Sequence, residues 1–286
     1  MMLCMQDGRR LQPDDFAHLL LDNDGLCWWC QKRPATTGEH KYKHSDLKRL
    51  MGDDDVLYWG DHEQFRELRG RSGIKRDRHG VVKFPKSMCG PCNNARSQPF
   101  DLAYDRYAKY VTERPTRKIP GLDFEAVYGE SWENDLLNLA RYFGKHFGCR
   151  MARSRVPVPE SLRSFLDGST DMPDAHMALI TTDSVHRLYR HGMYIGPDGV
   201  DVSSDCSRFT GYVMAVYLGS FGVRYMWSEE EIPNEERSQF FHFPRPLLNY
   251  FRTEEAVMRG DTRKPGLLVR FLQWAQKPRN DSGPES

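Results

Sequence analysis

Two pairs of cysteines constrain this chain more than any other feature: Cys27-Trp-Trp-Cys30 and Cys89-Gly-Pro-Cys92. A spacer of two residues lets one short turn present both sulfurs of a pair to the same ion, and zinc binds four thiolates tetrahedrally. We therefore predict a structural zinc site formed by these four cysteines. Because zinc with four thiolate ligands has no open position for water, any chemistry must come from residues that the site holds in place.

Three kinds of side chain lie close to the cysteine pairs in the sequence. Glu39 and His40 lie between the pairs, and Asn93 and Asn94 directly follow the second pair. An imidazole with a pKa near 6.5 can accept a proton at neutral pH. Carboxylate and amide oxygens are ligands suited to magnesium or manganese. An acid, a base and an amide are thus placed beside one metal site.

The order of these motifs resembles that of the HNH (ββα-metal) endonucleases, most closely the zinc-bearing branch typified by the recombination endonuclease VII family. The resemblance covers about residues 24 to 112. It implies metal-dependent hydrolysis of DNA, with His40 as general base and a Mg²⁺ or Mn²⁺ ion held by Glu39 and Asn93. Asn94 is the alternative ligand to Asn93. Relatives of endonuclease VII usually have Asp where this chain has Glu39.

His44 is a further catalytic candidate, four residues after His40. On a strand it would share the face of His40 and could bind the ion or contact phosphate. A surface position, or a structural role near the zinc, is the alternative interpretation of the same residue.

Positive charge is concentrated around these motifs. Residues 66–118 contain 14 Lys and Arg against 5 Asp and Glu, although the whole chain has a net charge of +1. Each phosphate that a protein neutralises releases counterions, so local positive charge favours a nucleic-acid ligand. The alternative is an ordinary solvated loop. The predicted DNA-binding residues are Lys41, Lys43, Arg69, Arg71, Lys75, Arg76, Arg78 and Arg96.

A chain of 286 residues is long enough for about two domains. We predict an α+β protein: a ββα-metal (HNH) nuclease domain over residues 1–118 with a basic insertion at about 45–80, then a separate α+β domain over 119–278 with no recognised motif. The polar residues 279–286 are predicted to be disordered.

Hydrophobic periodicity predicts the main elements. One helix buries Phe100, Tyr104, Tyr107 and Val111 and leaves Asp101 facing outward. The remaining predictions are helices at 13–23, 132–150 and 159–165, extended segments at 36–43 and 81–86, and strands at 177–181, 193–195 and 212–225.

The location and partners follow from composition and from the resemblance. The chain contains no apolar run of about 18 residues, and residues 1–10 lack the apolar core of a signal peptide, so we expect a cytoplasmic protein without membrane contact. The expected partner is duplex or branched DNA, in bacterial or phage DNA metabolism, restriction or antiviral defence. A homodimer, and a partner protein or small-molecule effector acting through the C-terminal domain, are further predictions.

Two other functions fit the same motifs. Residues 24–112 could form a zinc-stapled nucleic-acid binding module without hydrolysis, in which Glu39 and His40 are adjacent by coincidence. In the second alternative, the chain is an HNH effector whose C-terminal domain keeps cleavage silent until a ligand or partner binds.

Overall fold

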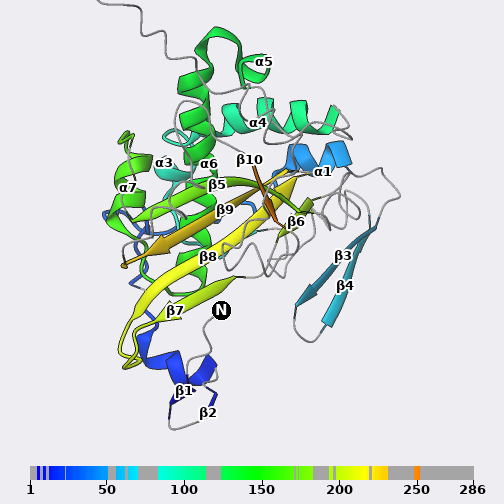
Figure 1. The fold of residues 1–286 in the computed structure, drawn as a ribbon. Coiled ribbons are helices and arrows are strands. Elements are labelled where there is room, and N and C mark those ends of the chain that lie inside the picture. The colour runs from blue at the N-terminus through cyan, green and yellow to red at the C-terminus, as the bar shows by residue number, and fades with distance from the viewer. Residues whose placement is uncertain are drawn as a thin grey trace, which may run out of the picture.

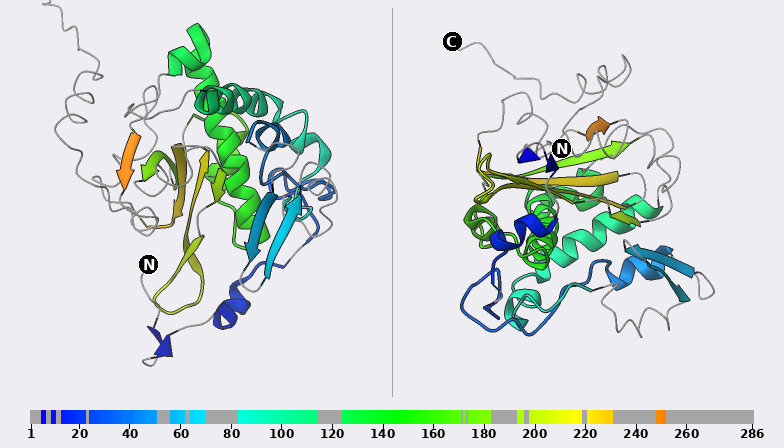
Figure 2. Two further views of the ribbon diagram at one scale, coloured as in Figure 1. Left: turned by 90° about the vertical axis from the view of Figure 1, so that its right-hand side faces the viewer. Right: turned by 90° about the horizontal axis from the view of Figure 1, so that it is seen from below.

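The structure is a computed structural model and describes residues 5–6, 9–10, 13–22, 24–50, 56–61, 64–69, 83–113, 124–170, 172, 174–182, 193–195, 198–218, 221–230 and 248–251. Helices pack on one face of a mostly antiparallel sheet, so the α+β class is confirmed (Figure 1, Figure 2). No helix among these residues is long and apolar enough to cross a membrane. The predicted tail at 279–286 lies outside the described residues.

The helical elements are centred on α6, which is the longest. Residues 138–149 of α6 are all buried, so this part of the helix is covered on every side, as expected for a helix between two layers. The helices are η1 (Pro13–Leu19), α1 (His44–Leu50), α3 (Gly90–Asn93), α4 (Gln98–Glu113), α5 (Phe124–Tyr128), η2 (Gly129–Ser131), α6 (Trp132–Arg153) and α7 (Glu160–Leu166).

The main sheet has the strand order β10-β5-β9-β8-β6, and β7 also pairs with β8. Its pairs are antiparallel except β10 with β5. The strands are β5 (Ala175–Thr182), β6 (Met193–Ile195), β7 (Gly199–Val202), β8 (Phe209–Leu218), β9 (Phe221–Ser228) and β10 (Leu248–Phe251). The segment predicted as one strand at 212–225 is a hairpin, because the chain reverses between β8 and β9.

Two short hairpins lie outside this sheet. One joins β1 (Met5–Gln6) to β2 (Arg9–Arg10), and the other joins β3 (Val56–Asp61) to β4 (Gln64–Arg69). The second hairpin and α1 occupy the predicted insertion at 45–80, and the hairpin lies apart from the main sheet (Figure 1). Arg69 ends β4, whereas Arg71, Lys75, Arg76 and Arg78 lie outside the described residues.

One hydrophobic core extends from the cysteine pairs through α4 and α6 to the sheet. It includes Trp29 of the first pair, Tyr107 of α4, Phe147 of α6 and Tyr225 of β9, each at most 2% exposed. The predicted stripe on α4 is confirmed, since all four of its apolar residues are buried. The segments predicted as separate domains, 1–118 and 119–278, thus contribute to the same core.

Candidate active site

The four cysteines converge although 59 residues separate Cys30 from Cys89. Their four sulfur atoms all lie within 4.8 Å of one another. The Sγ atoms of Cys30 and Cys89 are 3.8 Å apart, about the 3.8 Å edge of a tetrahedron with zinc–sulfur bonds of about 2.3 Å. The donor set and its spacing fit a zinc ion, as the sequence predicted.

Two sets of contacts favour the thiolate form of Cys30 and Cys92. Backbone N–H groups near Lys32 and Arg33 lower the pKa of the Cys30 thiol to about 7, although partial burial opposes this shift. The Arg96 guanidinium donates to the sulfur of Cys92 at 3.4 Å. Thiolate is the form that binds zinc, so both contacts favour the binding-competent state.

The segment before the second cysteine pair lies antiparallel to the Glu39-His40 segment. Isolated bridges join Thr37 to Met88 and His40 to Lys83, and the amide of Phe84 donates to the Glu39 carbonyl at 2.8 Å. Gly38 permits this approach, because a Cβ atom there would lie 2.2 Å from the Phe84 carbonyl oxygen. Two short extended segments, followed by α3 and α4, therefore form the surroundings of Glu39 and His40.

Glu39, His40 and Asn93 line one cleft of about 820 Å³, directly beside the cysteine cluster. Among the described side chains, the Oδ1 atom of Asn93 is one of the buried oxygens with no hydrogen-bond partner. The Asn94 amide is exposed and caps α3 by donating to the Gly90 carbonyl at 2.9 Å. A buried acceptor without a donor is unfavourable unless something binds it, so Asn93 is the better candidate ligand of the pair.

Glu39 is already paired within the protein. Its carboxylate accepts from the amide of His40 at 2.8 Å and lies 2.8 Å from Nζ of Lys145 on α6. Burial alone would raise the pKa of Glu39, but the positive charge of Lys145 lowers the pKa below its ordinary value. Glu39 is thus held ionised and in a fixed direction.

A second divalent cation in this cleft would have few protein ligands. In the described part of the chain, the cysteine cluster is the one group of three or more His, Cys, Asp or Glu side chains placed to hold an ion. Glu39 and Asn93 would supply two oxygens, which suits a magnesium ion that keeps several waters and shares a substrate phosphate.

His44 does not lie on a strand. It is the first residue of α1, so the period-two argument that placed it on the same face as His40 does not apply. The chain turns at 41–43 because α1 is anchored on α4: buried Asp46 accepts from the Tyr104 hydroxyl at 2.7 Å and pairs with Arg49. Burial raises the pKa of Asp46 to about 6.

The predicted DNA-binding residues near the cleft have different surroundings. Lys41 lies 5.8 Å from the ring centre of Phe84. Lys43 lines the cleft but donates to the Asp101 carbonyl at 2.7 Å and to Asp105 at 2.8 Å. Arg96 pairs with Asp167 as well as with Cys92. The last two therefore have structural contacts that the sequence did not indicate.

Sequence reasoning missed several residues of the cleft. Lys83 and Lys86 are exposed cations on its wall, and Asp101, predicted to face outward, lines it as well. Asp101 is turned inward because Lys145 approaches its carboxylate to 3.3 Å. Lys145 stands between Phe143 and Phe147 in the predicted helix, and a buried lysine needs an acidic partner.

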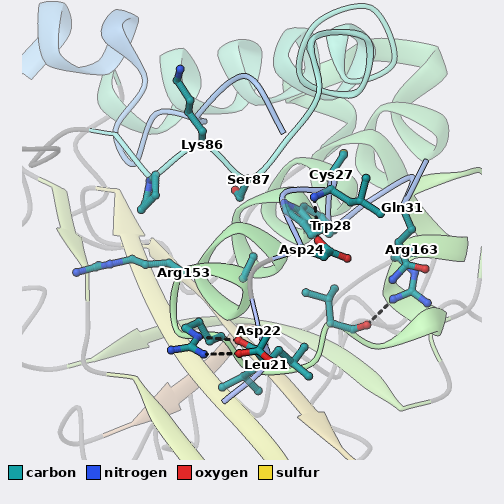
Figure 3. A pocket seen from close by; sticks show the side chains of 16 residues that line it. Leu21, Asp22, Asp24, Cys27, Trp28, Gln31, Lys86, Ser87, Arg153 and Arg163 are labelled. Carbon is teal, nitrogen blue, oxygen red and sulfur yellow. Dashed lines mark hydrogen bonds and ion pairs between the residues drawn. The ribbon is translucent and has the colours of Figure 1, made fainter. Parts of the chain in front are cut away.

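A second hollow of about 370 Å³ borders the first cysteine pair at Cys27 and Trp28 (Figure 3). Leu21 and Trp28 contribute apolar walls, and Arg153 and Arg163 flank it on opposite sides in this view. Lys86 lines both hollows.

Comparison with protein-family models, curated proteins and solved structures finds no match to this chain. The functional assignment therefore depends on the residues and their geometry.

Proposed function

We propose that this protein is a metal-dependent DNA endonuclease of the HNH type. The observation that supports this most is the cleft that Glu39, His40 and Asn93 line together, with a buried Asn93 Oδ1 atom that has no hydrogen-bond partner among the described residues. An acid, a base and an amide oxygen at one cleft are the groups that phosphodiester hydrolysis requires.

His40 is the proposed general base. The half-buried imidazole lines the open cleft, where water and a phosphate can both reach it. A neutral imidazole can take a proton from the attacking water. A divalent ion bound by Glu39 and Asn93 would supply neutralising charge for the phosphoryl oxygens and the departing alkoxide. The zinc cluster has a structural role in this scheme, because its four positions are filled by thiolates.

Exposed lysines beside the cleft supply the proposed contacts to the DNA backbone. Lys83 and Lys86 lie on the wall formed by the segment that pairs with Glu39-His40. Lys86 also borders the second hollow, so a bound strand could continue past the cleft along this wall. Neutralising Lys86 should weaken the binding of all DNA sequences alike. It should also reduce the slope of log affinity against log salt concentration by about one, as expected for the loss of one phosphate contact.

The deciding experiment compares plasmid cutting by the wild type, His40→Ala and a matched control, His18→Ala. His18 is exposed on η1 and its ring nitrogen lies 3.3 Å from the Cys206 carbonyl, so it tests the loss of a histidine outside the cleft. With Mg²⁺ or Mn²⁺ we expect the wild type and His18→Ala to cut alike and His40→Ala to lose at least about 100-fold. Equal cutting by all three proteins would refute the proposal.

One observation favours a second candidate, a zinc-stapled nucleic-acid binding module without catalysis. Both oxygens of Glu39 already have partners inside the protein, in His40 and Lys145. This module would bind DNA with the same affinity in Mg²⁺ and in a chelator too weak to remove zinc, whereas the nuclease should bind more tightly with the divalent ion. DNA binding without any cutting, and unchanged by the ion, would favour the module.

A further inference from the structure

Lys145 is a fully buried cation behind Glu39 and Asp101, two residues that line the cleft of the proposed active site. It lies on α6, and its side chain is 0% exposed. Its Nζ atom lies 2.8 Å from Oε2 of Glu39, 3.3 Å from Oδ1 of Asp101 and 3.3 Å from Oγ of Ser97. The long helix of the second half of the chain thus places a positive charge where the divalent ion would be held.

Each carboxylate that lines the cleft in the described part of the chain is paired with a cation. Glu39 pairs with Lys145, Asp101 with both Lys145 and Lys43, and Asp105 with Lys43 and Arg49. The adjacent His146 is buried, and its burial lowers its pKa to about 4, so it adds no positive charge at neutral pH. A divalent ion entering the free protein would therefore meet acids whose charge is already balanced.

We infer that Lys145 balances the charge of Glu39 in the free protein, so that the cleft binds a divalent ion tightly only when a substrate phosphate adds negative charge. This rests on the proposed function, since it concerns the ion of that same site. Like charges close together repel, and the ammonium competes for the oxygen atom that would bind the ion. Lys145 is accordingly a positioning residue that prevents the ion from being held without substrate.

Neutral substitutions of Lys145 separate this role from simple support of the fold. In Lys145→Gln the side chain can still donate a hydrogen bond to Glu39, but the charge is lost. Buried Glu39 then lacks a counter-charge and Asp101 keeps only Lys43, so a divalent ion is the available replacement. A purely structural lysine predicts the opposite, namely that its loss loosens Glu39 and weakens ion binding.

The test measures Mn²⁺ binding to the full-length, zinc-loaded protein without DNA, by electron paramagnetic resonance of the free ion. We expect Lys145→Gln to bind at least tenfold more tightly than the wild type, Lys145→Arg to resemble the wild type, and Glu39→Gln combined with Lys145→Gln to lose the gain. Lys109→Gln is the matched control, since this lysine is exposed on α4 and does not line the cleft. Affinity within twofold of the wild type, or weaker binding, in folded Lys145→Gln overturns the inference.

A second measurement decides the question if Lys145→Gln fails to fold. The wild type should bind Mn²⁺ at least tenfold more tightly in the presence of an uncleavable phosphorothioate duplex, and equal affinity with and without the duplex overturns the inference. Failure of the proposed function is recognised separately, as equal plasmid cutting by the wild type and His40→Ala.

Discussion

The two buried faces of α6 differ sharply. One face packs on the sheet through Ala140, Gly144 and Phe147: the Tyr225 hydroxyl donates to the Ala140 carbonyl at 2.5 Å, and the ring of Phe147 stacks on that of Tyr225. The other face meets the cleft through Lys145 and through His146, whose ring contacts Phe84 and Tyr142. One helix therefore supports an apolar interface and a polar one along the same turns.

Folding requires the apolar contacts on the sheet face of α6 but not the buried polar groups on its cleft face. Apolar packing on the sheet is enough to hold a helix, and removing it costs stability. The cleft face contains a buried ammonium, a buried imidazole with an Nε2 atom that has no described partner, and a nearby amide oxygen in the same state. Buried polar groups weaken a fold unless they are fully satisfied. Such groups in the proposed active site suggest that function keeps them there.

Removal of zinc should have the largest effect and should act on the cleft face. Structural zinc sites contribute roughly 10 kcal/mol in small domains, so a strong chelator should unfold the segments around Cys27 and Cys89. Hydrogen exchange should show loss of protection at 27–42 and 84–97 and retained protection in β8 and β9. Equal loss in the sheet would show that the two faces cannot be separated.

Phe147→Ala should have the largest effect among substitutions on the sheet face. The ring is 0% exposed and touches both Tyr212 and Tyr225, so the cavity should lower the free energy of unfolding by about 3–5 kcal/mol. Urea denaturation of zinc-loaded protein measures this change. Mn²⁺ affinity of the folded fraction should stay unchanged, and a change in it would mean that sheet packing alters the cleft directly.

Acid should destabilise the protein through the cleft face. Burial lowers the pKa of His146 to about 4, below its ordinary value of 6.5, so the unfolded chain binds this proton more readily than the folded one. The stabilisation is complete above pH 6.5 and is lost as the pH falls toward 4, by up to about 3 kcal/mol. His146→Leu should make the free energy of unfolding less dependent on pH between 6.5 and 4. An unchanged pH dependence would show that other groups cause it.

Tyr225→Phe should have the smallest measurable effect. It removes the hydroxyl that donates to Ala140 but keeps the buried ring. A single neutral hydrogen bond contributes about 1 kcal/mol, so the melting temperature should fall by only a few degrees. A loss comparable to that of Phe147→Ala would show that the sheet face also depends on polar contacts.

The sequence predicts repeating and clustered features of this protein well. The cysteine spacing predicts the four-cysteine cluster, and periodicity predicts α4, α6 and the stripe of buried aromatics on α4. The helix predicted at 13–23 forms as the 3₁₀ turn η1, and the helix at 159–165 as α7.

Features set by distant residues could not be predicted. His44 had the spacing of a strand neighbour, but Asp46 and Tyr104 fix a helix there. Asp101 reads as an outward position on α4 until Lys145 arrives from a helix 44 residues further along the chain. Lys43 and Arg96 read as free cations because their partners are equally remote. Charge pairing across long distances leaves no periodic trace in the sequence.

Gly148 is the point at which α6 meets the first cysteine pair. A Cβ atom there would lie 2.3 Å from Cη2 of Trp28, so the indole ring rests directly on the helix backbone. Trp28 follows the metal ligand Cys27 without an intervening residue. A shift of the helix along its axis would therefore displace Trp28 and with it Cys27, so the position of α6 is coupled to the geometry of the four-cysteine cluster.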